Sequence, residues 1–375
     1  MKILLVNYLE TTSPGGINKV IRELAINLST IGHDVTVLQP NPSKQESTES
    51  LSGFNIIRVS SRFDKYFYGL NYEMYRYLKK HLKELNPDVI HVHGYHSLLP
   101  IETIYTIKRI DPEIPIIFSP HLDIIKSTFA GKYLWNIYNL FARRVFKKSK
   151  YIISDSNFEA KNIEYIGVGK EKISVINPGV DTFEHIDKTR KIEKNSKENK
   201  IKLLYTGYLI SRKGVDFILN SLNILVNDIG FKEVVLTIVG DGPYKQDLLK
   251  LSENLKLEDY IVWKSFLPRE DLINEIINSD IFMLLSRSEA YGITVTEALT
   301  LKTPCIITNR TALKEFKDEP GCFIVDYPPK PKIIAELILD INKDDITVGP
   351  LTSKIRPWNE VIRDYERLYK SALSN

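Results

Sequence analysis

The chain has 375 residues, of which 43% are hydrophobic and 26% are charged. This length exceeds the usual size of one domain, so two domains are expected. The composition excludes collagen-like, mucin-like and wholly disordered proteins. A net charge of +4 is too small for a dedicated nucleic-acid binder. Two cysteines, Cys305 and Cys322, cannot supply a disulfide framework or a four-thiolate zinc site, so reduced thiols are expected.

The start of the chain does not read as an export signal. Its apolar run, residues 1–6, is interrupted by Asn7 and Glu10, and no small-residue cleavage site follows. No run of about twenty apolar residues occurs, so no bilayer-spanning segment is expected. We therefore expect a cytoplasmic protein. A peripheral location at the inner face of the membrane is the alternative.

Short apolar runs alternate with helical patterns in the first half, which is typical of βα units and parallel sheets. Strands are expected at Lys2–Asn7, Asp34–Gln39, Asn55–Val59, Val89–His93, Ile116–Ser119, Tyr151–Ser154 and Ile173–Ile176. A helix is expected over Asn18–Ile31, because its apolar residues share one stripe and Gly32 follows it. These elements predict a single parallel sheet with covering helices.

The second half repeats the alternation and predicts a second doubly wound sheet. Its strands are expected at Lys202–Tyr205, Val234–Val239, Tyr260–Trp263, Ile281–Ser286, Thr303–Thr308 and Cys322–Val325. Helices are expected over Val215–Val226 and Tyr244–Leu255.

Between the halves, the segment Asp187–Lys200 is dense in charge and nearly devoid of large apolar residues. Such a segment cannot contribute to a core, so it marks a boundary. We expect an N-terminal domain over residues 1–186, a linker over 187–200, a C-terminal domain over 201–356 and a final segment, 357–375. In that segment Trp358–Leu373 is predicted to be an amphipathic helix. Two facing doubly wound domains are the simplest architecture.

A pair of glycines, Gly15 and Gly16, lies between the first expected strand and the first expected helix. Ligands of doubly wound sheets bind at the carboxyl ends of the strands, where this loop must lie. Glycines let backbone amides approach a ligand, and a helix N-terminus favours phosphate. A plain turn is an equally consistent interpretation. The dinucleotide fingerprint Gly-x-Gly-x-x-Gly is absent.

The most informative constellation is Ser286–Leu299, where an apolar strand ends and a helix begins after Gly292. Glu289 lies in the loop, and Glu297 lies about one turn into the helix on the face of Thr294. Carboxylates there can accept hydrogen bonds from sugar hydroxyls, while the amides of Ile293 and Thr294 can bind phosphate oxygens. Two solvated glutamates are the structural alternative.

Two adjacent cations, Arg212 and Lys213, follow Gly207 and precede another expected helix. A strand-to-helix loop on the same rim as Glu289 is suited to a diphosphate. Surface cations are more often simply solvated, so the position beside Glu289 is what favours the functional interpretation.

Taken in order, these motifs resemble the retaining GT-B glycosyltransferases of family GT4. The resemblance covers nearly the whole chain. It is carried by the spacing Glu289-x7-Glu297, the pattern Gly207…Lys213-Gly214, the turn 240–243 (Gly-Asp-Gly-Pro), the segment Asn177-Pro178-Gly179-Val180-Asp181, the N-terminal glycine loop and the Trp358 helix.

The resemblance implies a GT-B fold, with the C-terminal helix crossing back to the first domain. It also implies transfer of a hexose-type sugar from a nucleotide diphosphate sugar to a glycan or lipid-linked acceptor, with retention, no cofactor and no obligatory metal. By the family pattern Glu297 holds the ribose hydroxyls, Glu289 faces the donor sugar and Lys213 balances the diphosphate. His121, in Ser119-Pro120-His121, matches a histidine near the reacting sugar.

For His121 the alternative is an ordinary core or loop histidine. His91, His93 and His96 are close in sequence, but no cysteine or carboxylate cluster accompanies them, so a metal site is not expected.

Three positions depart from the family pattern. Tyr208 stands where the family usually has arginine, Lys302 replaces a glycine, and Arg310-Thr311 replace a glycine pair. These departures put the donor-side phosphate contacts and the identity of the donor in question, while they leave the expected fold unchanged.

The segment Lys132–Lys150 is predicted to be an amphipathic helix with a strongly basic end. The cations are Arg143, Arg144, Lys147, Lys148 and Lys150. Such an end can contact anionic lipid or a lipid-linked phosphate acceptor. A solvated helix end, favoured by its own dipole, is the alternative.

Our interpretation is a retaining glycosyltransferase that binds donor through its C-terminal half and acceptor through its N-terminal half, with no nucleic-acid partner. A nucleotide-sugar 2-epimerase of the same fold and a nucleotide-sugar-binding protein without turnover remain alternatives. A glycoside hydrolase is disfavoured, because Glu289 and Glu297 come from one loop and helix rather than from opposite sides of a substrate.

Overall fold

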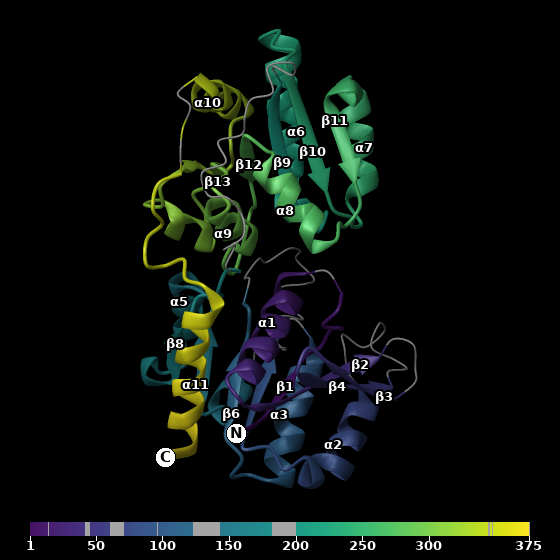
Figure 1. Ribbon diagram of the computed structural model, residues 1–375, viewed down its shortest axis with the longest axis vertical. Helices are drawn as coiled ribbons and strands as arrows, with labels where there is room; N and C mark the ends of the chain where they lie inside the picture. Colours follow the sequence, from purple (N-terminus) through teal and green to yellow (C-terminus); the bar gives the residue numbers. More distant parts are fainter. Residues whose placement is uncertain are drawn as a thin grey trace. The chain divides into compact units, whose positions relative to one another are not determined.

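The computed structural model describes residues 1–13, 15–41, 46–60, 71–95, 97–122, 143–181, 200–343, 346 and 348–374. The chain forms two compact units (Figure 1). The first unit contains Met1–Gly179 and Arg356–Asn375, and the second contains Val180–Ile355. The division therefore falls between Gly179 and Val180. Except for its last residue, the charged linker expected over 187–200 lies outside the described residues.

The first unit is built on an eight-stranded sheet in the order β3-β4-β2-β1-β5-β6-β7-β8. Its strands are β1 (Lys2–Val6), β2 (Asp34–Asn41), β3 (Ser47–Leu51), β4 (Phe54–Ser60), β5 (Val89–His93), β6 (Ile116–Ser119), β7 (Tyr151–Ser154) and β8 (Ile173–Val175). Seven of them form the expected parallel sheet. An eighth strand, β3, which was not predicted from the sequence, pairs with β4 in antiparallel register at one edge.

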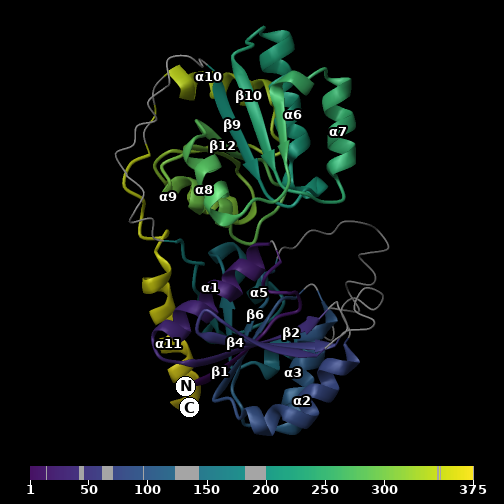
Figure 2. The same cartoon turned by 45° about the vertical axis from the view of Figure 1, so that its right-hand side comes forward.

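Helices cover both faces of this sheet. They are α1 (Gly16–Thr30), α2 (Tyr72–Leu85), α3 (Leu98–Ile110), α5 (Asn157–Tyr165) and α11 (Trp358–Ser374), with a 3-10 turn at Lys170–Lys172. Because side chains alternate along a strand, Ile90 and Val92 of β5 join the core that includes α2 and α3, whereas His91 and His93 point to the other face. On that face α11 packs against α1 and β5. The two helices lie side by side in both views (Figures 1 and 2).

The second unit is built on a six-stranded sheet in the order β11-β10-β9-β12-β13-β14, in which every pairing is parallel. Its strands are β9 (Ile201–Thr206), β10 (Val234–Val239), β11 (Ile261–Lys264), β12 (Ile281–Leu284), β13 (Cys305–Thr308) and β14 (Cys322–Val325). Its helices are α6 (Val215–Asn223), continued by a π turn over Ile224–Asp228, α7 (Lys245–Asn254), α8 (Arg269–Ile277), α9 (Ile293–Thr300) and α10 (Pro331–Lys343). Short 3-10 turns lie at Ser211–Lys213 (η2), Glu258–Tyr260 and Thr311–Phe316 (η5).

The strand order of the second sheet reverses between β9 and β12. Chain order runs outward from β9 through β10 to β11, and then β12 returns to the other side of β9. Ligands of doubly wound sheets bind in the crevice at the carboxyl ends of such neighbouring strands. The loops that follow β9 and β12 carry Lys213 and Glu289. The fold therefore confirms two doubly wound α/β units and directs attention to this edge.

Candidate active site

The loop after β9 is held tightly against the end of β12. Gly214, which closes the turn η2, has φ +71°, and a Cβ at this position would lie 2.0 Å from the carbonyl oxygen of Leu285. Only glycine permits that approach and that backbone conformation. The amide of Arg287 donates to the carbonyl of Arg212 (2.7 Å), which joins the two loops from the other side. Lys213 is therefore presented from a fixed turn.

Lys213 and Glu289 form a partly buried ion pair at this edge. The Lys213 Nζ lies 2.7 and 2.9 Å from the two carboxylate oxygens, and Ser286 Oγ donates to Oε1 (2.6 Å). Burial opposes ionisation of Glu289, but the charges of Lys213 and then Arg212 outweigh it, so the pKa of Glu289 lies below its ordinary value. The carboxylate is therefore ionised and points to the cations.

Arg212 also faces this loop. Its guanidinium NH1 donates to the carbonyl of Ser288 (3.2 Å), and the side chain is half-buried. Tyr208, which stands in place of the family arginine, is 51% exposed, and its phenol cannot supply a positive charge. Within the loop that follows β9, the two adjacent cations thus remain the groups suited to an anionic ligand.

Helix α9 begins beside Glu289 and carries the second glutamate. Gly292 is its N-cap at φ +128°, and Ile293 and Thr294 form the first turn, whose amides have no partner within the helix. Glu297 is buried one turn further on, and its Oε1 lies 2.7 Å from NH1 of Arg269. The predicted residues of the second unit are therefore brought to one edge, and Arg269 joins them.

The departures from the family pattern have local structural roles. Thr311 adopts φ +52°, and its Oγ1 accepts a hydrogen bond from the amide of Glu289 (3.0 Å). The guanidinium of Arg310 stacks over the ring of Tyr327 at 4.4 Å. Lys302 has φ +67° just after α9 ends, the conformation for which a glycine would be favoured. Thr311 thus fixes the loop that carries Glu289.

In the first unit, side-chain hydrogen bonds hold the loop that carries Gly15 and Gly16. Gly15 is the N-cap of α1 with φ +146°. Asn18, buried in the first turn, donates from Nδ2 to the carbonyl of Ser13 and accepts at Oδ1 from Asn7 at the end of β1. Gly16 is the first residue of the helix. These bonds position the glycine backbone at the carboxyl edge of the sheet, as predicted.

His121 lies at the same edge, after β6, and both of its ring nitrogens are engaged. Nδ1 lies 2.6 Å from Oδ2 of Asp155, and Nε2 lies 3.1 Å from Nδ1 of His93. Burial opposes protonation of His121, but the charge and hydrogen bond of Asp155 outweigh it, so the pKa of His121 is raised. Burial lowers the pKa of His93, which favours its neutral form. Both ring nitrogens of His121 are therefore held by neighbouring side chains.

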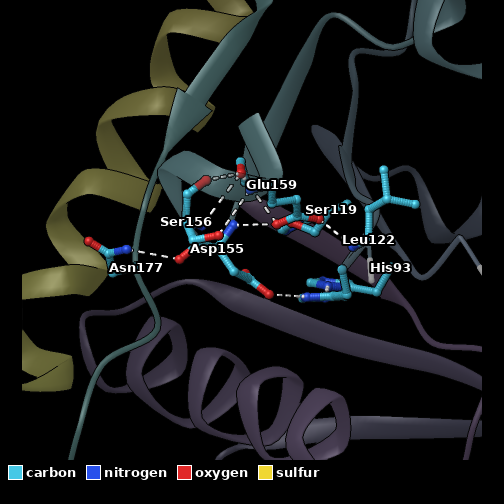
Figure 3. Close-up of polar contacts among 10 residues, drawn as sticks. His93, Ser119, Leu122, Asp155, Ser156, Glu159 and Asn177 are labelled. Carbon is cyan, nitrogen blue, oxygen red and sulfur yellow. Dashed lines mark hydrogen bonds and ion pairs between the residues drawn. The ribbon is translucent and has the colours of Figure 1, made fainter. Parts of the chain in front are cut away.

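Glu159, in the first turn of α5, holds the backbone next to His121 and at Asp155 (Figure 3). Its carboxylate accepts hydrogen bonds from the backbone amides of Leu122, which follows His121, and of Asp155. Burial and the nearby Asp155 raise the pKa of Glu159 to about 8. Its own amide donates to Ser156 Oγ (3.1 Å). Sequence reasoning did not identify Asp155 or Glu159, although Ser156-x-x-Glu159 is the spacing of a capping box and marks this helix start.

The other histidine of β5 joins the network to the C-terminal helix. His91 contacts Tyr369 Oη through Nδ1 (2.7 Å) and Ser119 Oγ through Nε2 (2.8 Å). His96 lies outside the described residues. In the described ranges, no group of three or more histidine, cysteine or acidic side chains is arranged to hold a metal ion.

The basic helix end is described over residues 143–148, which are helical, whereas 123–142 lie outside the described residues. Arg143, Arg144 and Lys147 are exposed and line a cavity of about 600 Å³ together with Phe146 and Val168. Two further cations have local partners: Lys150 donates to the carbonyl of Ala372, and Lys148 lies over the ring of Tyr105. Over the part of the chain that the structure covers, no helix has the length and apolar character needed to cross a bilayer.

Two doubly wound units, a C-terminal helix that returns to the first of them and a carboxylate–cation site at the switch point of the second define a GT-B glycosyltransferase. Comparison with known families agrees. Residues 14–183 match the family model Glycosyltransferase Family 4, and residues 187–356 match Glycosyl transferases group 1. The chain belongs to this glycosyltransferase family, and the predicted family and enzyme class are confirmed.

Some relatives match nearly the whole chain. An uncharacterised 41.2 kDa protein in the cps region of Klebsiella pneumoniae is 24% identical, over 98% of this chain and 99% of its own. Sucrose-phosphate synthase from Thermosynechococcus elongatus superposes with a TM-score of 0.80 at 16% identity, over 100% and 99% of the two chains. HepE of Anabaena, solved in complex with UDP and glucose, gives 0.75 at 16% identity, over 99% and 100%. At these identities the solved structures support the fold.

Proposed function

We propose that the protein transfers a hexose from a UDP-sugar to a glycan or lipid-linked acceptor with retention at the anomeric carbon. The observation that carries this proposal is the Lys213–Glu289 pair, with Arg212 beside it, at the first turn of α9. UDP is favoured as the nucleotide because the structural relative HepE was solved with UDP and with UDP-glucose.

The proposed roles of the donor-binding residues follow from the negative charge that develops on the leaving diphosphate. When the bond between the anomeric carbon and the diphosphate breaks, its electron pair goes to the phosphate oxygen. Lys213, Arg212 and the amides of Ile293 and Thr294 stabilise that developing charge without reorganisation. Glu289 accepts hydrogen bonds from sugar hydroxyls, and Glu297 accepts them from the ribose. Since cations and amides already supply positive potential, we propose that no divalent ion is obligatory.

The acceptor hydroxyl forms the new bond to the anomeric carbon, and its proton goes to the departing phosphate oxygen. This route needs no carboxylate base. It agrees with the engagement of both nitrogens of His121, for which we propose a role in shaping the sugar-binding loop rather than in moving the acceptor proton. Gly15 and Gly16 provide backbone amides in the first unit, where we place the acceptor.

A thermal-shift panel of UDP-, GDP- and ADP-sugars tests the donor assignment. Binding raises the apparent stability by an amount set by ligand concentration over Kd, so UDP-sugars should raise Tm most. Turnover then separates the alternatives. Acceptor-dependent release of UDP supports transfer, release of UDP with a free altered sugar identifies an epimerase, and binding without turnover under any acceptor identifies a binding protein.

We also propose that Arg143, Arg144 and Lys147 contact an anionic membrane surface. They are exposed and lie within one and a half turns of the same helix, so they present a basic surface that suits an anionic, phosphate-rich interface. Sedimentation with vesicles of anionic phosphatidylglycerol should capture the protein, and neutral phosphatidylcholine vesicles should not. The triple change of these cations to glutamate should abolish capture, whereas the change of the exposed Lys161 of α5 to glutamate should not. Equal capture of all variants would exclude this surface.

A further inference from the structure

Arg269 forms a three-membered ion cluster around the glutamate of α9. The guanidinium NH1 lies 2.7 Å from Oε1 of Glu297, and NH2 lies 2.6 Å from Oδ2 of Asp181. Arg269 is the first residue of α8, and Asp181 lies at the start of the second unit. Three segments that are distant in the sequence therefore meet at one side chain.

The cluster fixes the orientation of the Glu297 carboxylate. Its side chain is only 4% exposed, and a buried carboxylate needs a compensating partner. Arginine supplies a planar fork, which can hold two acceptors at set angles where an ammonium acts as a point charge. Because Asp181 holds the other arm of the fork, the guanidinium cannot rotate freely away from Glu297. Glu297 is thus held in one position before any ligand arrives.

The Arg269 cluster and the proposed diphosphate site also differ in the charged groups that they present. The cluster contains two carboxylates and one guanidinium, whereas the loop after β9 presents Arg212 and Lys213. Carboxylate oxygens accept hydrogen bonds from hydroxyl groups and repel phosphate oxygens. The side chains of Arg269 and Asp181 are 32% and 25% exposed, so solvent reaches the cluster on their side.

We infer that Arg269 is a positioning residue for recognition of a ribose cis-diol: it holds Glu297, and Asp181 holds Arg269. This inference rests on the proposed function, in which Glu297 binds the ribose of the donor nucleotide. It assigns a role to Asp181, the last residue of the segment Asn177–Asp181, and to a cation that no sequence motif singled out.

The test compares UDP with 2′,3′-dideoxy-UDP by calorimetry, because the two ligands differ only in the hydroxyls concerned. A hydrogen bond to a charged group predicts that the wild-type protein binds UDP about ten- to a hundredfold more tightly. Arg269→Ala should reduce this ratio to within about threefold, mainly by weakening UDP. Arg269→Lys should keep part of the ratio, and Asp181→Asn should reduce it less than Arg269→Ala. Arg356→Ala, which removes a matched Arg356–Asp364 pair (2.7 Å) in the first unit, should leave the ratio unchanged.

The outcomes distinguish failure of the positioning role of Arg269 from failure of the proposed ribose-binding role of Glu297. If UDP does not bind, or if Glu297→Gln keeps the full ratio, the ribose assignment fails, and the inference fails with it. If Glu297→Gln abolishes the ratio and Arg269→Ala keeps it, only the inference is overturned. An equal loss of affinity for both ligands in Arg269→Ala and Arg269→Lys would show that Arg269 acts elsewhere on the nucleotide or on the fold, and would also overturn it.

Discussion

Replacing Arg212 by alanine tests whether this chain has relocated the phosphate-binding charge that its family carries at the position of Tyr208. The side chain of Arg212 is half-buried and donates to the carbonyl of Ser288 at 3.2 Å, next to Glu289. Its charge contributes to the lowered pKa of Glu289. Arg212 is therefore directed along the loop that binds the donor in our proposal, and not simply into solvent.

The expected magnitude follows from the bond that is lost. A charge-assisted hydrogen bond contributes about 1.5–3 kcal/mol, which corresponds to about a ten- to hundredfold loss in kcat/KM for the UDP-sugar. Steady-state kinetics at saturating acceptor would measure it. Arg287→Ala is the matched control, because this neighbouring arginine is exposed and donates instead to Tyr327 Oη (2.9 Å). It should stay within about twofold of wild type, well below the value of one such bond.

A second substitution tests whether a guanidinium at position 208 can replace the one at position 212. Tyr208→Arg, introduced into Arg212→Ala, should restore part of kcat/KM, because it returns a guanidinium to the same loop. The reasoning would be refuted by an Arg212→Ala enzyme whose kcat/KM is within twofold of wild type. A lowered Tm with unchanged kcat/KM would refute it too, since Arg212 would then serve the fold alone.

Three further predictions concern the metal, the phosphate loop and the buried acid. Turnover should persist in excess EDTA, and a loss that manganese restores would contradict a metal-free mechanism. Gly214→Ala should lower the free energy of unfolding by at least about 2 kcal/mol, because its Cβ would meet the Leu285 carbonyl at positive φ; an unchanged urea midpoint would show that the loop can move. The pKa of Glu159 is raised from 4.5 to about 8, so between these values the folded state retains a proton that the unfolded state has released. The free energy of unfolding should then fall with rising pH by up to about 1.4 kcal/mol per pH unit, and Glu159→Gln should flatten this slope in urea titrations at pH 5 to 8. Parallel curves for variant and wild type would count against it.

Periodicity predicted the two doubly wound sheets because their buried strands are short and apolar. β3 was missed for the opposite reason: Ser47–Leu51 is polar and largely exposed, so it carries no buried face and no apolar alternation. Its pairing depends on the neighbouring β4, which a local pattern cannot show. The two compact units meet between Gly179 and Val180, a few residues before the charged segment 187–200.

The candidate site was predictable where its residues share one loop. Glu289, Gly292 and Glu297 lie within a single strand–loop–helix segment, so spacing alone placed them together. Arg269 and Asp155 were not identified, because their partners are remote in the sequence and the contacts arise only when several strands end at one edge. A lone arginine at a helix start and a lone aspartate after a strand give no signal of their own.

We propose that the carboxyl edge of the second sheet binds a UDP-sugar through Lys213, and calorimetric titration of UDP-glucose into wild type and Lys213→Gln measures this binding. We expect a measurable wild-type Kd and a Kd at least about tenfold weaker in the variant, since the cation facing the diphosphate is lost. Equal affinity in the two proteins, with Tm values that show both are folded, would contradict it.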